Sequence, residues 1–199
     1  MCQAVGHRCK CSAVWPLTTP PTPIACCHRY IGLRSAIVAA VTAYLAILSH
    51  RDAIRWVLAE QRMAFPSTPR AEVRALAAGD RLYLYATRGA MLNPTRDRGR
   101  IIATATATAA VRVLDEPVSL AGRVFASGCP LTVEGVVLHP GGLELQPLVN
   151  QLAAFPKPDA WSAYMRRPLL GLAENDVALL DKHLTPMLVR REEALATYP

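Results

Sequence analysis

Two segments with strictly alternating side chains, joined by an arginine-rich loop, constrain the fold of this chain more than any other feature. They occupy residues 79–114. In residues 81–87, RLYLYAT, leucines alternate with Tyr83 and Tyr85, which is the period of a β-strand. Residues 100–114 alternate Thr with Ala and are rich in Val, which favours a second, long strand over a helix. The pattern places both tyrosines on one face of a strand–loop–strand unit.

The loop between these strands is basic and carries the chain-breaking Pro94 and Gly99. Its polar residues include Arg88, Asn93, Arg96 and Arg98, and Arg100 opens the next strand. A strand pair with a basic loop beside two tyrosines indicates a binding mouth on a small β-barrel.

The rest of the chain after residue 50 predicts a mixture of strands and helices. A strand is expected over residues 54–59 and a short helix over residues 71–78, ending at Gly79. Residues 115–117 and 127–130 read as breaks, which leaves strands over residues 118–125 and 131–138 and a short one over 143–145. Helices are expected over residues 147–155, 159–167, 174–183 and 187–196. We therefore expect an α+β fold.

The chain is long enough for one domain with extensions. It has 199 residues, of which 52% are hydrophobic, so a substantial core is expected. The net charge of +7 suits a phosphate-bearing partner. All cations except three lysines are arginines, the residue best suited to paired contacts with phosphates and bases. The same bias arises in GC-rich genomes, so it does not identify a partner by itself.

The first 30 residues are rich in Pro and Cys and show no period, so we expect a disordered or poorly ordered tail. Five of the six cysteines lie there, and only Cys129 lies in the body of the chain. This distribution does not form a disulfide framework, so we expect a reducing compartment and a cytoplasmic protein. The spacings Cys9-x-Cys11 and Cys26-Cys27 are poor matches to structural zinc hooks, so we expect no metal.

Residues 31–49 are the most apolar run, and we expect a helix there. Arg34 interrupts the run, which barely reaches the length of a membrane span. Three interpretations stay open: a buried or partly exposed helix, an upstream extension from a misplaced start codon, and a membrane anchor. The domain itself is expected over residues 50–199.

Several segments resemble the EVE domain of the PUA-like superfamily. They are residues 54–58, residues 79–85 (GDRLYLY) and residues 100–105 (RIIATA), and the late segment PKPDAW resembles the closing region of that domain. The likeness spans residues 50–170. Ala103 stands where a Gly is common, and residues 1–48 have no counterpart, which favours the misplaced-start interpretation. The resemblance implies a small PUA-like β-barrel with flanking helices.

The resemblance also implies a module that binds DNA or RNA and holds a modified base in an aromatic pocket. A base outside its stack needs an aromatic face and hydrogen bonds at its edge, and its phosphates need cations. The candidate faces are Trp56, Tyr83, Tyr85 and Trp161, the candidate edge-reading residues are Thr87 and Asn93, and the candidate phosphate contacts are Arg88, Arg96, Arg98 and Arg100.

Each candidate also has a structural interpretation. The two tryptophans are typical of a core. The two tyrosines share one face, so we expect a single environment for both, either the pocket or the solvent. The arginine loop fits a solvated turn held by Asp97 equally well.

A catalytic function is less well supported than binding. ASCH relatives of this fold include an amidohydrolase that uses a lysine, but no lysine lies between Lys10 and Lys157. Arginine does not release its proton at usable pH and cannot replace it. Cys129 and His139 have no spacing that predicts contact. We therefore expect no catalytic residues and no cofactor. The alternative is an enzyme or binder that acts on a small nucleoside-like ligand in the same pocket.

Overall fold

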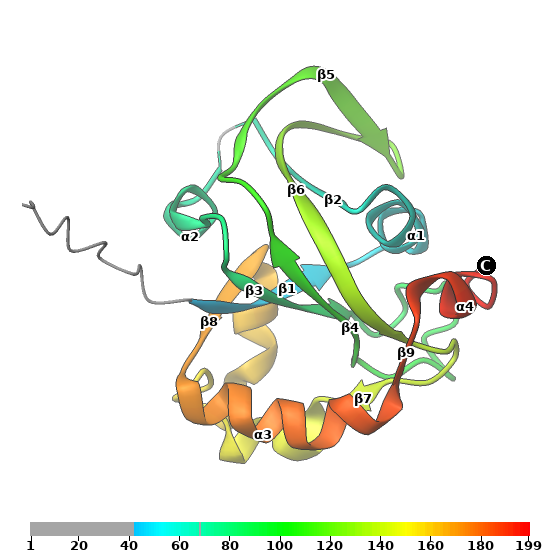
Figure 1. Cartoon of the computed structure of the whole chain (residues 1–199). Helices are drawn as coiled ribbons and strands as arrows, with labels where there is room; N and C mark the ends of the chain where they lie inside the picture. The colour runs from blue at the N-terminus through cyan, green and yellow to red at the C-terminus, as the bar shows by residue number, and fades with distance from the viewer. Residues whose placement is uncertain (1–41, 68) are drawn as a thin grey trace, which may run out of the picture. The chain divides into compact units, whose positions relative to one another are not determined.

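The computed structural model describes residues 42–67 and 69–199 (Figure 1). The predictions for the tail over residues 1–30, for its cysteines and for the first part of the 31–49 segment concern residues outside this description.

The described residues form an α+β fold around one curled, mixed β-sheet that makes a half-barrel (Figure 1). Along its main path the strands pair in the order β2 (Arg62–Phe65), β6 (Arg123–Val137), β4 (Arg100–Ala107), β3 (Arg81–Ala86), β1 (Ala43–Leu48) and β8 (Leu169–Leu172). Three further strands pair beside this path: β5 (Arg112–Leu120) and β9 (Leu188–Val189) with β6, and β7 (Leu143–Glu144) with β4. The α+β class and the barrel-like curl are as predicted.

The strand β1 corrects the prediction of an apolar helix over residues 31–49, at least for residues 43–48. It pairs parallel to β3 and antiparallel to β8. Leu45 and Ala46 point to opposite faces of the sheet, and both are fully buried. A strand buried on both faces reads as a continuous apolar run, which periodicity alone cannot distinguish from a buried helix. The expected domain boundary at residue 50 is therefore too late.

Residues 54–59 also differ from the prediction, because they lie in helix α1 (Arg51–Glu60) and not in a strand. His50 begins the helix, since its Nδ1 accepts a hydrogen bond of 3.2 Å from the backbone N–H of Asp52. The buried residues of α1 recur at the spacing of three and four that marks one helix face: Ile54, Val57 and Leu58. Six residues were too short a window to show this period.

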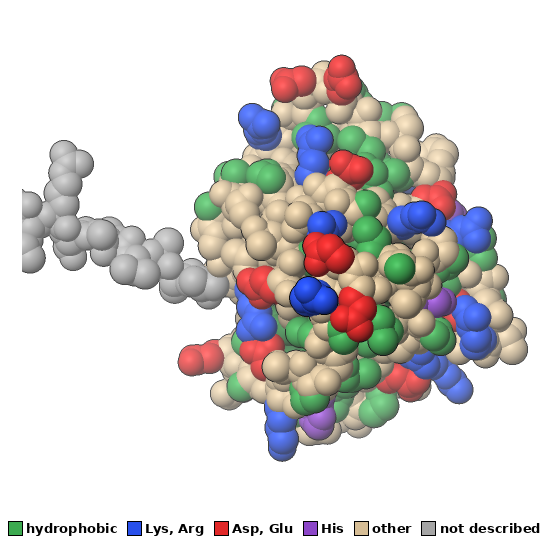
Figure 2. Space-filling view, turned by 45° about the vertical axis from the view of Figure 1, so that its right-hand side comes forward, with side chains coloured by type: hydrophobic (Ala, Val, Ile, Leu, Met, Phe, Trp, Pro, Cys, Tyr) green, Lys and Arg blue, Asp and Glu red, His purple; other side chains and the backbone are tan. Residues whose placement is uncertain are grey.

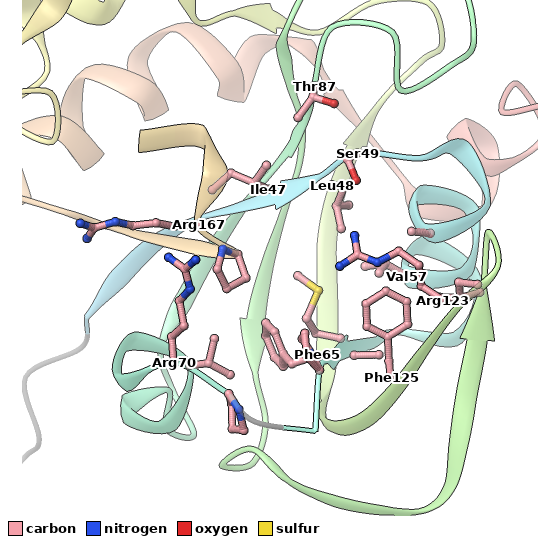
Figure 3. A pocket seen from close by; sticks show the side chains of 18 of the residues that line it. Ile47, Leu48, Ser49, Val57, Phe65, Arg70, Thr87, Arg123, Phe125 and Arg167 are labelled. Carbon is pink, nitrogen blue, oxygen red and sulfur yellow. The ribbon is translucent and has the colours of Figure 1, made fainter. Parts of the chain in front are cut away.

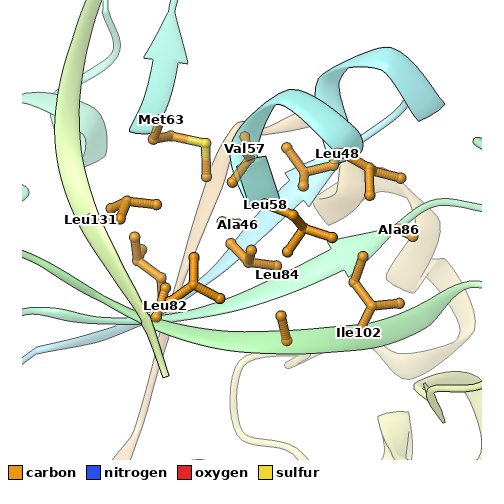
Figure 4. Packing of buried hydrophobic residues seen from close by; sticks show 14 of the residues in the cluster. Ala46, Leu48, Val57, Leu58, Met63, Leu82, Leu84, Ala86, Ile102 and Leu131 are labelled. Atoms are coloured by element: carbon orange, nitrogen blue, oxygen red, sulfur yellow. The ribbon is translucent and has the colours of Figure 1, made fainter. Parts of the chain in front are cut away.

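The strand β3 has the predicted alternation, and both of its faces are covered. Leu82 and Leu84 lie in a core cluster on the concave side of the sheet, together with residues of α1 (Figure 4). Tyr83 and Tyr85 lie in a second cluster on the other face. Two-sided burial explains why the alternation is between two kinds of apolar side chain instead of apolar and polar ones.

The predicted long strand over residues 100–114 is divided, because β4 ends at Ala107 and β5 begins at Arg112. The expected break at residues 115–117 lies inside β5, at a register shift between Val113 and Val118. The strands β5 and β6 form a hairpin whose turn is Ala121–Gly122, with φ values of +49° and +73°. Positive φ at both positions suits the twist of a tight hairpin.

The strand β6 passes without interruption through the second expected break, residues 127–130. Up to Pro130 it pairs with β2, and from Leu131 it pairs with β4. Proline has no N–H to donate, and here it lies where the strand changes partners. The carbonyl of Pro130 still accepts a hydrogen bond of 3.0 Å from the N–H of Thr108. The polar and turn-like residues therefore mark a change of partner instead of a turn.

Helices cover both faces of the sheet (Figure 1). The remaining ones are α2 (Ala71–Ala75), the 3₁₀ helices η1 (Gln146–Gln151), η2 (Pro158–Arg166) and η3 (Thr185–Met187), α3 (Glu174–Leu184) and α4 (Arg191–Leu195). The predicted helix over residues 187–196 is only partly present, because residues 188–189 form β9. Among the described residues, no helix has the length and apolarity needed to cross a membrane.

Candidate functional site

A pocket of about 320 Å³ lies where the curled sheet stays open (Figure 3). In the described part of the chain, β1 pairs with β3 and β8, and β2 pairs with β6, so β1 and β2 do not pair with each other. The helix α1 connects these two strands along the chain. The walls come from the ends of these two strands, from α1 and α2, from the β5–β6 hairpin and from the segment between η2 and β8. The volume lies at the lower end of the range for small-ligand sites, about 300–1,000 Å³.

The interior of the pocket is mainly apolar and contains three aromatic side chains. Phe65 of β2 is buried, and Trp56 of α1 and Phe125 of β6 are half-buried. The buried side chains of Val57 and Met63 add aliphatic and thioether surface. Such an interior favours a ligand with an apolar or aromatic part.

Two hydroxyl groups lie at one side of this interior. Ser49 follows β1 and Thr87 follows β3. Because these strands are parallel, their carboxyl ends lie at the same edge of the sheet. The N–H of Thr87 donates to the carbonyl of Leu48 at 2.9 Å and holds the two ends together. In Figure 3 both side chains lie on the side of the pocket away from Phe65 and Phe125. Each hydroxyl can donate or accept a hydrogen bond.

Four arginines line the pocket, and the described residues contribute no carboxylate to it. They are Arg70, Arg123, Arg166 and Arg167, which we call the pocket arginines. All four are exposed, and none forms an ion pair with another residue in the described part of the chain. The pocket lining in this part of the chain also contains no Asp, Glu, His, Lys, Cys or Tyr. Four cations without a counter-charge favour an anionic ligand.

The pocket arginines are held by separate elements. Arg123 and Phe125 share one face of β6, and the guanidinium carbon lies 5.7 Å from the centre of the ring, a cation–π contact. Arg167 precedes Pro168, whose carbonyl accepts the N–H of Ile47 at 2.9 Å and so fixes the segment against β1. Arg70 comes directly before α2. The fold therefore presents these cations from different directions.

The arginine loop, residues 88–99, contrasts with the pocket. Arg96 forms an ion pair with Asp97 at 2.8 Å, and Arg88 Nε donates to the carbonyl of Pro94 at 3.0 Å. Asn93 Oδ1 accepts the N–H of Arg96 at 3.2 Å, so its side chain stabilises the turn of the loop. Arg98 is exposed and has no ion pair among the described residues.

At the end of this loop, Arg100 pairs with Glu144 at 3.0 Å. The predicted set of Arg88, Asn93, Arg96, Arg98 and Arg100 is thus together in one loop and its flank, but none of its members lines the pocket.

The tyrosines of β3 are a correction to the predicted site. Tyr83 and Tyr85 are 0% and 2% exposed, on the face of β3 opposite to the concave side. A ring without an exposed face cannot stack on a base. The phenol of Tyr83 donates to Asp181 Oδ1 at 2.7 Å, and burial, followed by this hydrogen bond, raises the pKa of Tyr83. Burial raises the pKa of Tyr85 to about 12. Alternation along the strand placed both side chains correctly on one face, but that face is core.

The two predicted tryptophans have different locations. Trp56 lines the pocket, as does Thr87. Trp161 is half-buried, packs against the second core cluster and makes an edge-to-face contact with Phe155, with ring centres 6.3 Å apart. Trp161 does not line the pocket, and only the C-terminal end of η2 reaches it.

Sequence reasoning missed most of the pocket: Ser49, Phe65, Arg70, Phe125, Arg123, Arg166 and Arg167. One available signal was the spacing of Arg123 and Phe125, which places a cation and a ring on one face of a strand. Another was the pair of arginines before Pro168. Neither signal indicates that the segments meet in space, which depends on the curl of the sheet.

The described residues contain no group of three or more His, Cys, Asp or Glu that could hold a metal ion. Cys129 is buried, and burial raises its pKa to about 11, so its thiol stays protonated near neutral pH. A protonated, buried thiol is a poor nucleophile.

The distribution of charge over the surface does not mark a site by itself. On the face in Figure 2, Lys and Arg side chains are interspersed with Asp and Glu and form no single basic patch. The distinguishing feature of the pocket is therefore the absence of carboxylates from its described lining, and not the total charge of the chain.

The chain matches no protein-family model and no curated protein sequence. Similar solved structures include the protein Rpa0253 from Rhodopseudomonas palustris, at 13% identity and a TM-score of 0.47, over 74% of this chain and 95% of that one. PSPTO5229 from Pseudomonas syringae has 11% identity and a TM-score of 0.46, over 69% and 95%. Atu2648 from Agrobacterium tumefaciens has 10% identity and a TM-score of 0.44, over 71% and 92%.

Proposed function

We propose that this chain is a nucleic-acid-binding module that holds a modified base of DNA or RNA in the pocket and contacts the neighbouring phosphates with the pocket arginines. One observation carries the proposal: four arginines without ion pairs in the described residues surround an apolar, aromatic pocket that has no carboxylate in its lining. Phosphates supply the missing negative charge, and a base supplies a flat, largely apolar part.

The individual residues have distinct roles in this proposal. Trp56, Phe65 and Phe125 provide apolar and aromatic surface against the faces of the base. Ser49 and Thr87 provide hydroxyls for its polar edge. The aliphatic and thioether side chains beside them favour a base that carries an added apolar group, which supports recognition of a modified base.

The arginine loop extends the same surface. Arg88 directly follows the pocket residue Thr87, so the loop begins at the pocket. We propose that Arg88, Arg96, Arg98 and Arg100 contact phosphates further along the strand. Arg98 is the most available of them, because the others already bind acceptors within the protein.

We also propose that the domain is PUA-like and of the EVE type. The support is the resemblance of residues 79–85 and 100–105, which form β3 and the start of β4, within a curled sheet with flanking helices. One segment of the resemblance, residues 54–58, lies in a helix instead of the expected strand.

A small nucleoside-like ligand is the second candidate, and the modest pocket volume of about 320 Å³ favours it. Turnover needs a general base or an activated nucleophile. The described lining offers only the hydroxyls of Ser49 and Thr87 and always-protonated arginines. This composition supports binding over catalysis.

A binding experiment tests the proposal. Single-stranded DNA and RNA oligonucleotides, with and without methylated cytosine or adenine, are titrated into the full chain at low salt. We expect salt-dependent binding, tighter for one modified base, that Trp56→Ala weakens at least about tenfold. Trp161→Ala is the matched control and leaves affinity unchanged. Absence of oligonucleotide binding at low salt, or equal loss in both tryptophan variants, would overturn the proposal.

A further inference from the structure

The pocket arginines form two groups on opposite sides of the apolar interior. Figure 3 shows Arg70 and Arg167 on one side of Phe65, and Arg123 on the other side near Phe125. Arg166 directly precedes Arg167 in the same segment of the pocket wall, and we count it with the first group. Arg123, the hairpin arginine that lines the pocket, is thus separated by apolar side chains from the cations near β8 and α2.

This separation is built into the fold. Arg123 belongs to the β5–β6 hairpin and lies over the Phe125 ring. Arg167 belongs to the segment that is held against β1 by the hydrogen bond from the N–H of Ile47 to the carbonyl of Pro168. The backbone carbonyl of Arg70 accepts the N–H groups of Val73 and Arg74 at 3.1 and 3.0 Å, which fixes this residue at the start of α2. Separate elements thus hold the two groups on opposite sides of the apolar side chains.

A ligand with one phosphate would therefore leave one group without a counter-charge. A base with a phosphate on each side would satisfy both groups, because its apolar part fills the space between them. This is the chemistry of a nucleotide inside a strand, which has one phosphate on its 5′ oxygen and one on its 3′ oxygen. A nucleoside monophosphate or a free end offers only one of these two anions.

We infer that the pocket takes a nucleotide phosphorylated on both its 5′ and 3′ oxygens, with Arg123 on one phosphate and Arg70, Arg166 and Arg167 on the other; this inference rests on the proposed function. The ligand is consequently an internal nucleotide of a strand, and no free end is required. The Arg123–Phe125 contact keeps the hairpin cation directed into the site.

The test uses adenosine and cytidine as 5′-monophosphates, 3′-monophosphates and 3′,5′-bisphosphates, together with a single-stranded oligonucleotide. Each is titrated into the full chain by calorimetry at low salt. We expect each bisphosphate to bind at least about tenfold more tightly than either monophosphate, since each charge-assisted contact to a phosphate contributes substantially. The oligonucleotide should bind at least as tightly as the bisphosphate.

Two variants separate the phosphates. Arg123→Ala should reduce the bisphosphate to the affinity of a monophosphate, and Arg167→Ala, which leaves Arg70 and Arg166 in place, should weaken the bisphosphate by a smaller factor. Each should leave one monophosphate unaffected, and the unaffected monophosphate should differ between the two variants. Arg123→Lys keeps the charge but not the paired geometry and should fall between wild type and Arg123→Ala. Arg190→Ala removes an exposed arginine that does not line this pocket and is the matched control.

The outcomes distinguish this inference from the proposed function. If the oligonucleotide binds but bisphosphates bind no better than monophosphates, or if both variants weaken the same monophosphate, the two-phosphate inference is overturned and the binding function stands. If the bisphosphates bind as expected and no oligonucleotide binds, the contact of the two arginine groups with two phosphates stands, and both the nucleic-acid function and the internal nucleotide of a strand are overturned. If none of these ligands binds, both are overturned.

Discussion

The guanidinium of Arg81 and the carboxylate of Asp181 meet in two parallel hydrogen bonds, Nη1 to Oδ2 at 2.6 Å and Nη2 to Oδ1 at 2.9 Å. The phenol of Tyr83 donates to the same Oδ1 at 2.7 Å. Three hydrogen bonds to one side chain therefore attach α3 to β3. This pairing contrasts with the pocket, where the described lining contains four arginines and no carboxylate.

Removal of this carboxylate should destabilise the fold. Asp181→Ala leaves the buried phenol of Tyr83 without its acceptor, a loss expected to be about 1–3 kcal/mol in the free energy of unfolding. Tyr83→Phe removes one hydrogen bond and its donor together and should cost less, about 1 kcal/mol. Urea denaturation measures both. Asp159→Ala, an exposed aspartate in η2, is the control and should stay within experimental error. Equal stability of Asp181→Ala and Asp159→Ala would contradict this account.

Gly99 is required because Tyr85 occupies the space that a Cβ atom would need. A Cβ at position 99 would collide with the Tyr85 hydroxyl and lie 2.8 Å from the ring carbon that carries it. Gly99→Ala should therefore cost about 1–3 kcal/mol of stability. Tyr85→Phe removes the hydroxyl and should rescue part of that loss, so the double variant should be more stable than the sum of the single changes predicts.

Gly171→Ala is the matched control for the Gly99→Ala variant, because a Cβ atom at position 171 has no other atom within 4 Å. It should have little effect on the midpoint of denaturation. If the double variant loses as much free energy of unfolding as the two single variants together, the two residues do not interact as described.

His139 should make stability depend on pH. Burial, followed by the nearby charge of Arg96, lowers the pKa of His139 below its usual value of 6.5. The unfolded chain then binds the proton at a higher pH than the folded chain. The stabilisation is fully present above pH 6.5 and is lost as the pH falls through the folded pKa. Denaturation midpoints between pH 7.5 and pH 5 should therefore fall less steeply in His139→Gln than in wild type. Parallel profiles would refute this role.

Local sequence patterns predicted those elements whose side chains have one clear period. The strand β3 and the helix α3 are examples, because alternation and helical spacing each extend over several residues. Residues 43–48 and 54–59 were assigned to the wrong type of structure. The first is apolar on both faces, and the second is too short a window for its helical period to appear.

The pocket was harder to predict than the elements. Trp56 and Thr87 were identified, but Arg70, Arg123 and Arg167 come from three segments far apart in the chain. Their proximity depends on the curl of the sheet and on the change of partner within β6, and no local pattern records either. The arginine-rich loop was the more visible signal because its cations lie close together in the sequence, although most of them are already bound to acceptors in the protein.

The salt dependence of oligonucleotide binding tests the central claim most directly. For single strands, the logarithm of the association constant falls with the logarithm of salt concentration by about 0.7 for each phosphate neutralised. The double variant Arg123→Ala/Arg167→Ala should therefore have a slope that is shallower than wild type by about 0.7 per arginine removed. Arg190→Ala should keep the wild-type slope. A wild-type slope in the double variant would contradict the claim that the pocket arginines bind the phosphates.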